Sequence, residues 1–100
     1  MSADTLLEEK TKTIIKEPSK WTVIVLNDDT TPMDFVVAML IEIFKHDEEK
    51  AVRTTLSIHE SGSGVAGIYD FEIAEAKAVD GTKMARDNGF PLQIKIANQN

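Results

Sequence analysis

The 100-residue chain contains no cysteine. Disulfide scaffolds, thiol catalysis and thiolate metal sites are therefore excluded. No apolar run approaches the roughly 20 residues that a membrane-spanning helix needs, and the N-terminus has no hydrophobic signal region. We therefore expect a cytoplasmic protein with no membrane partner. A chain of this length makes one domain with little room for a deep cofactor cavity, so we expect no cofactor.

Positive charge is also scarce. Eleven lysines and arginines face 17 acidic residues, which gives a net charge of -6. An acidic surface repels phosphate, so we expect no nucleic-acid partner. Residues 21–50 hold seven of the acids against Lys45 and Lys50. Such a region attracts cationic partners, although acidic surfaces also serve simple solubility.

The pattern of apolar residues predicts an α+β fold in the order β-α-α-β-α-β. We expect a single-domain open sandwich in which three helices pack on a three-stranded antiparallel sheet. Residues 1–17 are polar and predict a flexible N-terminal extension, and residues 18–100 form the core domain. The predicted elements are strands at 21–26, 65–69 and 92–97, a helix from Thr31 to Phe44, a shorter helix after Asp47 and a helix at 71–86. The nearly continuous apolar run at 21–26 predicts a central, well-covered strand.

Several end signals support these elements. Thr31 can cap the first helix, with Pro32 in its first turn. Lys45 and His46 follow at its C-terminal end, where positive charge suits the helix dipole, and we expect His46 on the surface. Asp47 and Asp70 are candidate N-caps for the second and third helices. Residues 62–64 predict a loop.

Gly81 follows Asp80 inside the third predicted helix. The dipeptide is also a hairpin-turn signal. Helical spacing from Phe71 to Arg86 outweighs it, at a cost of about 1 kcal/mol for an internal glycine. We expect Gly81 to loosen this helix.

Enzymatic chemistry has little support in the sequence. Asp28 or Asp29 with His59 could act as an acid–base pair in a small hydrolase. No serine has the setting of an activated nucleophile, and no phosphate-binding glycine loop is present. A metal site needs three or four ligands, which two unrelated histidines and scattered carboxylates do not supply. We therefore expect neither an enzyme nor a metal site.

The run Asn27-Asp28-Asp29 is the more informative feature. Asn and Asp are turn residues, so backbone capping alone explains their presence. If the second helix packs beside this turn, however, Asn27, Asp28 and His59 form a polar corner. An apolar hollow would adjoin that corner, lined by Met33, Thr55, Ile58 and Leu92. Taken singly, these apolar positions are typical of a core.

Four segments in order carry a family resemblance. LNDDTTPMDFVVAML is followed by SIHESG, GIYDFEIAEAK and MARDNGFPL. Together they closely resemble ClpS, the adaptor of the bacterial Clp protease, over roughly Pro18 to Leu92. The block around Asn-Asp-Asp and Thr-Pro-Met is the specific part, and the order of the later segments strengthens it.

The resemblance implies a function. Adaptors of the ClpS type bind proteins that begin with Leu, Phe, Tyr or Trp, and deliver them to the ClpA-type AAA+ unfoldase that feeds the ClpP peptidase. By motif, Asn27, Asp28 and His59 would bind the α-amino group of the substrate. The side-chain pocket would involve Asp29, Thr31, Met33, Thr55, Ile58 and Leu92. Glu72 and Lys77 match the surface that faces the N-domain of the unfoldase, and the extension would act during delivery.

These residue types suit that ligand. A free α-amino group is largely an ammonium ion at neutral pH and presents only donors. Amide oxygen, carboxylate and neutral imidazole supply the acceptors, directly or through water. Thr55 departs from the family, because many members have methionine there, and the hollow is then wider or wetter. The C-terminal residues also lack the expected acidic ending.

A second hypothesis comes from a different class. The same order of elements resembles the C-terminal domain of the ribosomal stalk protein, a protein–protein docking module. In that case the helix faces bind the partner and Asn27–Asp29 is only a turn. Under either hypothesis we expect a monomer.

Overall fold

The computed structural model describes residues 19–99. It contains β2 (Lys20–Leu26), α1 (Met33–Glu42), α2 (Glu48–Ser61), β3 (Ser63–Asp70), α3 (Phe71–Asp87) and β4 (Gln93–Asn98). The order β-α-α-β-α-β and the α+β class are therefore confirmed. The predicted extension at residues 1–17 lies outside the described residues.

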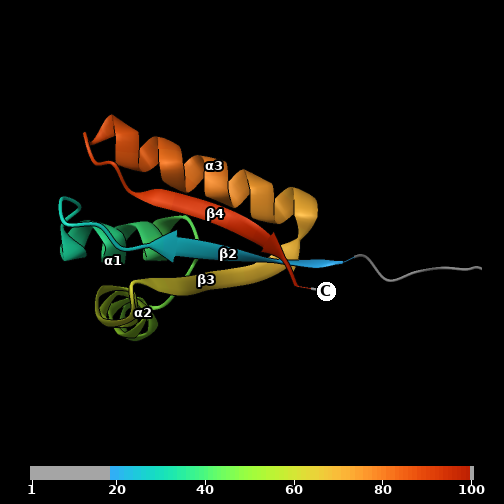
Figure 1. The fold of residues 1–100 in the computed structure, drawn as a ribbon, viewed down its shortest axis with the longest axis horizontal. Coiled ribbons are helices and arrows are strands. Elements are labelled where there is room, and N and C mark those ends of the chain that lie inside the picture. The colour runs from blue at the N-terminus through green and yellow to red at the C-terminus, as the bar shows by residue number, and fades with distance from the viewer. Residues whose placement is uncertain (1–18, 100) are drawn as a thin grey trace, which may run out of the picture.

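The sheet is antiparallel with the order β3-β2-β4, so β2 is its central strand (Figure 1). Val23 and Val25 on β2 are fully buried, whereas Thr22 and Ile24, which alternate with them, are only half-buried. This alternation means that one face of the strand carries the core. The apolar run at 21–26 correctly predicts a central strand, but the strand is well covered on that face only.

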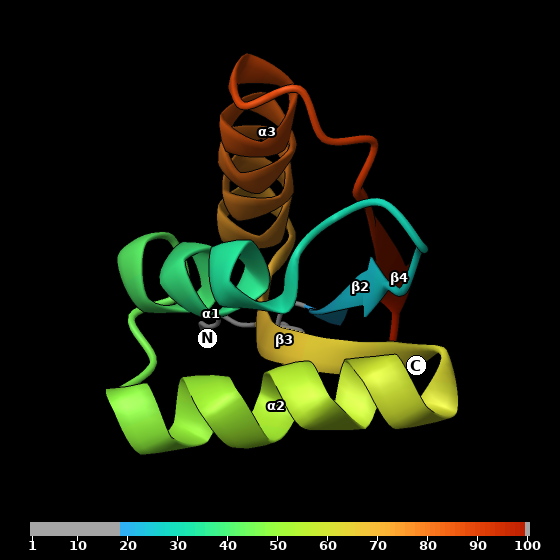
Figure 2. The same ribbon diagram turned by 90° about the vertical axis from the view of Figure 1, so that its left-hand side faces the viewer.

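The three helices complete the core. Figure 2 shows α1 between α3 and α2, with the sheet beside them. Met39 and Leu40 on α1 are fully buried and join residues of all three strands and the other two helices in one cluster. Its buried members are Val23, Val25, Val36, Met39, Leu40, Phe44, Ala51, Ile58, Ala66, Ala74, Ala85 and Leu92.

Two predicted helix starts differ in detail. The cap of α1 is Pro32, without a side-chain hydrogen bond, because the Thr31 hydroxyl instead donates to Asp28. Asp70 does precede α3, but its carboxylate accepts from the Lys20 ammonium at 2.9 Å rather than capping the helix. Asp47 caps α2 as predicted, since its carboxylate accepts from the Lys50 N–H at 2.8 Å.

His46 is buried, which contradicts its predicted place on the surface. Lys45 adopts a left-handed conformation with φ of 62°, and the chain turns there. The Nε2 atom of His46 lies 2.7 Å from the carbonyl oxygen of Ala66 on β3. As Nε2 donates to this carbonyl, His46 ties the end of α1 to the sheet.

The cation at the end of α1 comes from another helix. Lys77 on α3 donates from Nζ to the carbonyl of Ile43 at 2.8 Å and lies over the Tyr69 ring. Carbonyls at a helix C-terminus are partly negative, so this contact suits the helix dipole. Lys45, which we expected in this role, is exposed.

Gly81 does not interrupt α3, and its small size has a packing reason. A Cβ atom at this position would lie 2.7 Å from Cδ1 of Ile94 on β4 and 3.4 Å from Sδ of Met39 on α1. The glycine therefore permits α3 to approach β4 and α1 closely. The predicted loop at 62–64 is also shorter than expected, because β3 begins at Ser63 directly after α2 ends.

The two histidines provide a matched test of this packing. We expect His46→Ala to lower the free energy of unfolding by about 1–3 kcal/mol, because the buried carbonyl of Ala66 loses its donor. His59→Ala, at an exposed site, should change it by less than about 0.5 kcal/mol. Urea unfolding followed by circular dichroism measures both. Equal destabilisation by the two substitutions would contradict the role given to His46.

Candidate functional site

Three segments meet at one end of the sheet. The loop after β2, the C-terminal half of α2 and the turn between α3 and β4 all lie there, at the left of Figure 1. A hydrogen bond joins two of them, from the N–H of Asn27 to the carbonyl of Gly62 at 2.9 Å. Residues about thirty positions apart in sequence thus share one corner.

This corner contains a small hollow. Its lining consists of Asn27, Asp28, Thr31, Met33, Val36, Thr55, Ile58, His59 and Leu92. The structure therefore brings together the proposed amine-binding residues and nearly all of the predicted pocket residues. Asp29 is exposed and does not line the hollow. The sequence did not predict Val36 as a pocket residue, because its helical spacing also fits a core residue. Val36 belongs both to the core cluster and to the lining of the hollow.

Asp28 organises the loop. Its Oδ1 accepts from the N–H groups of Thr30 and Thr31 at 2.8 and 2.7 Å, and its Oδ2 accepts from the Thr31 hydroxyl at 2.8 Å. Burial raises the pKa of Asp28, but hydrogen bonds from Thr31 and Thr30 and the charge of Arg86 lower it by more. The pKa therefore lies below its ordinary value of 3.8, and the carboxylate is ionised at neutral pH.

Asn27 and His59 complete the polar side of the hollow. Both are exposed, and neither side chain has a hydrogen-bond partner within residues 19–99. Asn27 comes directly before the loop that Asp28 organises, and His59 lies near the end of α2. An amide and an imidazole thus remain available for a ligand beside a fixed carboxylate.

The apolar wall depends on two positioning residues. Gly64 on β3 permits close approach to α2, because a Cβ atom there would lie 2.6 Å from Cγ1 of Ile58. Arg86 donates from one guanidinium nitrogen to the carbonyls of Phe90 and Leu92 at 2.9 and 2.8 Å. These bonds hold the turn that carries Leu92 into the wall. Sequence patterns gave no signal for Arg86.

The hollow itself is narrow. It holds about 10 Å³, which is roughly the room that one water needs. Met33 is one of the residues that line the hollow, and it is 38% exposed. A methionine side chain has three rotatable bonds, so Met33 is the part of the wall that can move to admit a larger group.

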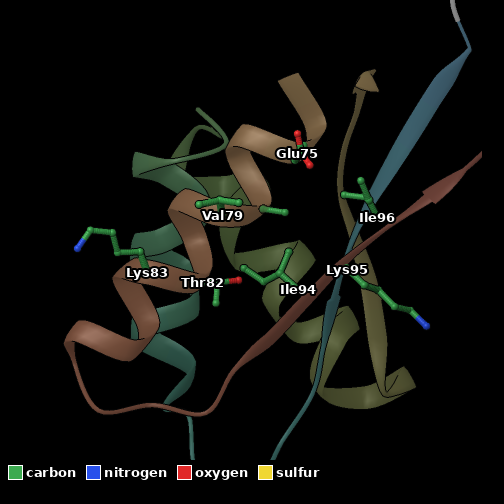
Figure 3. Close-up of a pocket in the computed structure, with 8 residues that line it drawn as sticks. Glu75, Val79, Thr82, Lys83, Ile94, Lys95 and Ile96 are labelled. Atoms are coloured by element: carbon green, nitrogen blue, oxygen red, sulfur yellow. The ribbon is translucent and has the colours of Figure 1, made fainter. Parts of the chain in front are cut away.

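A larger groove lies elsewhere, between α3 and β4. It measures about 540 Å³ and is mostly apolar. Figure 3 shows Ile94 pointing toward Thr82 and Val79 on the helix, whereas Lys95 points away from it. The groove shares no residue with the polar corner. Size alone therefore does not identify the site, because the groove lacks converging acceptors.

Glu72 and Lys77 lie on α3 and occupy different environments. Glu72 is exposed in the first turn, in a shallow depression with Asp70, Phe71 and Ile73. Lys77 is half-buried, with its ammonium on Ile43. Five residues correspond to about 140° around a helix axis, so the two side chains do not share one face.

Comparison with known proteins identifies the family. The sequence profile of the ATP-dependent Clp protease adaptor protein ClpS matches residues 16–95. The chain belongs to the ClpS family. It is 50% identical to the ClpS adapter of Oleidesulfovibrio alaskensis over 94 residues, covering 94% of this chain and 86% of that protein. It is 42% identical to the ClpS adapter of Helicobacter hepaticus over 92 residues, which cover 92% of this chain and 93% of that protein.

A solved structure agrees with the fold. The structure of Agrobacterium tumefaciens ClpS2 bound to L-phenylalaninamide matches with a TM-score of 0.81 and 34% identity, covering 83% of this chain and all of that one. The chain is thus a Clp protease adaptor and not an enzyme. This membership favours the adaptor hypothesis over the ribosomal stalk module and the small hydrolase.

Two further features are absent from residues 19–99. No helix in this part of the chain is long and apolar enough to cross a membrane. No three metal-ligating side chains in it are grouped as a metal site would require.

The lowered pKa of Asp28 predicts a pH-dependent contribution to stability. A carboxylate with a depressed folded-state pKa stabilises the fold above its unfolded pKa of 3.8, and this contribution is lost as the pH falls through the folded value. We expect Asp28→Asn to be less stable than the original chain near neutral pH, with the gap closing in acid. Urea unfolding of both from about pH 7 to about pH 3 measures this gap. A gap that does not change with pH would contradict the account.

Proposed function

We propose that this adaptor binds proteins whose first residue is large and hydrophobic and delivers them to a ClpA-type unfoldase of the Clp protease. The observation that carries the proposal is the meeting of Asn27, Asp28 and His59 along a hollow whose other lining residues are mostly apolar. That combination suits a ligand that is a cation at one end and apolar at the other. A chain start with Leu, Phe, Tyr or Trp has this form.

The α-amino group is assigned to the polar side. An ammonium needs acceptors, and Asn27 and His59 have free ones while the Asp28 carboxylate supplies the charge. Asp28 already accepts three hydrogen bonds. A carboxylate has about four lone-pair sites, so a contact from Asp28 to the ammonium is direct through Oδ2 or passes through a water.

The first side chain is assigned to the apolar part of the hollow. Ile58 and Leu92 form its fixed wall, and Met33 moves aside to admit the ligand. Thr31 and Thr55 add hydroxyl groups to the lining. The complex of the Agrobacterium relative with L-phenylalaninamide supports this assignment, because that ligand has a free amine and an aromatic side chain.

Delivery is assigned to the surface around the start of α3. Glu72 is exposed there beside Phe71 and Ile73, which are 41% and 49% exposed. Apolar side chains rimmed by a charge are typical of a protein docking site. Lys77, the other residue assigned to this interface, lies on a different face of α3 with its ammonium on the carbonyl of Ile43. Residues 1–17 would act during transfer, and the adaptor would work as a monomer.

Amine recognition is tested with paired peptides. A peptide that begins with Phe should bind, and its N-acetylated twin should bind at least about tenfold more weakly, because charge-assisted hydrogen bonds to the ammonium are lost. Fluorescence anisotropy measures both affinities. His59→Ala should reduce the ratio between the affinities of the free and the N-acetylated peptide. Equal affinity of the two peptides for the original chain would refute amine recognition.

The docking surface is tested by charge reversal. Glu72→Arg should reduce unfoldase-dependent degradation of a substrate that begins with Phe, while peptide binding stays unchanged. Glu49→Arg is the matched control, since Glu49 is also an exposed acid in the first turn of a helix. Degradation assays with ClpA and ClpP and anisotropy with the peptide separate the two steps. Full degradation with Glu72→Arg would exclude Glu72 from the interface.

A further inference from the structure

The hollow contains one buried polar atom without a partner. Thr55 on α2 is 2% exposed, and its Oγ1 makes no hydrogen bond with any described residue. A helical threonine commonly satisfies its hydroxyl on the carbonyl four residues earlier, which this one does not do. Buried polar groups are nearly always paired, so a hydroxyl without a protein partner in the lining of a ligand site is available to a polar group of the ligand.

The position of Thr55 indicates which part of the ligand it meets. Thr55 precedes His59 by four residues, so both lie on one face of α2, about one helical turn apart. One turn is comparable with the length of an aromatic side chain. If His59 binds the amino group, the tip of the first side chain lies near Thr55.

We propose that Thr55 Oγ1 hydrogen-bonds a polar group at the tip of the first side chain, so that a first Tyr is preferred over a first Phe. This inference rests on the proposed function and specifies its substrate class. Among large hydrophobic first residues, Tyr carries a hydroxyl at its far end, which both donates and accepts. Phe would leave the Thr55 hydroxyl buried and unpaired.

The narrowness of the hollow does not affect this comparison. Tyr and Phe differ by one oxygen, and both need the same opening at Met33. The change of this ratio between the original chain and Thr55→Val therefore isolates the Thr55 contact from the cost of opening the pocket.

The experiment measures the affinities of two peptides that differ only in a first Tyr or Phe, by fluorescence anisotropy with the full chain. We expect Tyr to bind about three- to tenfold more tightly, as one hydrogen bond allows. Thr55→Val should bring the ratio of Tyr to Phe affinity to about one, and Thr55→Ser, which retains a hydroxyl, should keep the preference for Tyr.

Thr54→Val is the matched control, because Thr54 is half-buried and does not line the hollow. It should leave the ratio unchanged. Thermal melting checks folding, and Thr55→Val should melt no lower than the original chain, since it removes an unpaired buried hydroxyl. The same ratio in the original chain and in Thr55→Val would overturn the proposal. If neither free peptide binds better than its N-acetylated form, the proposed function itself fails.

Discussion

The carboxylate of Asp28 is the contact on which the candidate site depends. It holds the backbone of Thr30 and Thr31 and the hydroxyl of Thr31. These bonds define the path from the central strand to the first helix, and with it the positions of Asn27 and Met33. Since the same carboxylate stays ionised, one group both shapes the loop and gives the corner its negative charge. The conformation of the loop and the negative charge available to a cationic ligand therefore depend on the same side chain.

The rest of the fold brings the other walls to this loop. The antiparallel partner β3 follows α2 directly, which places the end of α2 next to the end of β2. On the other side, Arg86 holds the turn before β4 and so sets the place of Leu92. The candidate site is thus formed where the ends of secondary-structure elements meet, while the cluster around Met39 and Leu40 keeps the elements in place.

The adaptor role suits a site made of binding groups. A carrier must bind its cargo and later release it, so a shallow contact with a few charged hydrogen bonds and one side-chain pocket is adequate. Association and ordering costs consume much of the contact energy. The free side chains of Asn27 and His59, the movable Met33 and the unpaired hydroxyl of Thr55 are all groups whose partners the ligand can supply.

The order of elements, the central place of β2 and the composition of the polar corner can be read from the amino-acid sequence. Local signals were strong there, because strands, turns and amphipathic helices have their own residue patterns. Family motifs then predicted which distant residues would meet. The burial of His46, the contact of Lys77 with α1 and the close approach at Gly81 follow only from the packing of the folded chain. Each of these depends on a neighbour from a distant segment, and no local pattern of residues specifies which neighbour that is.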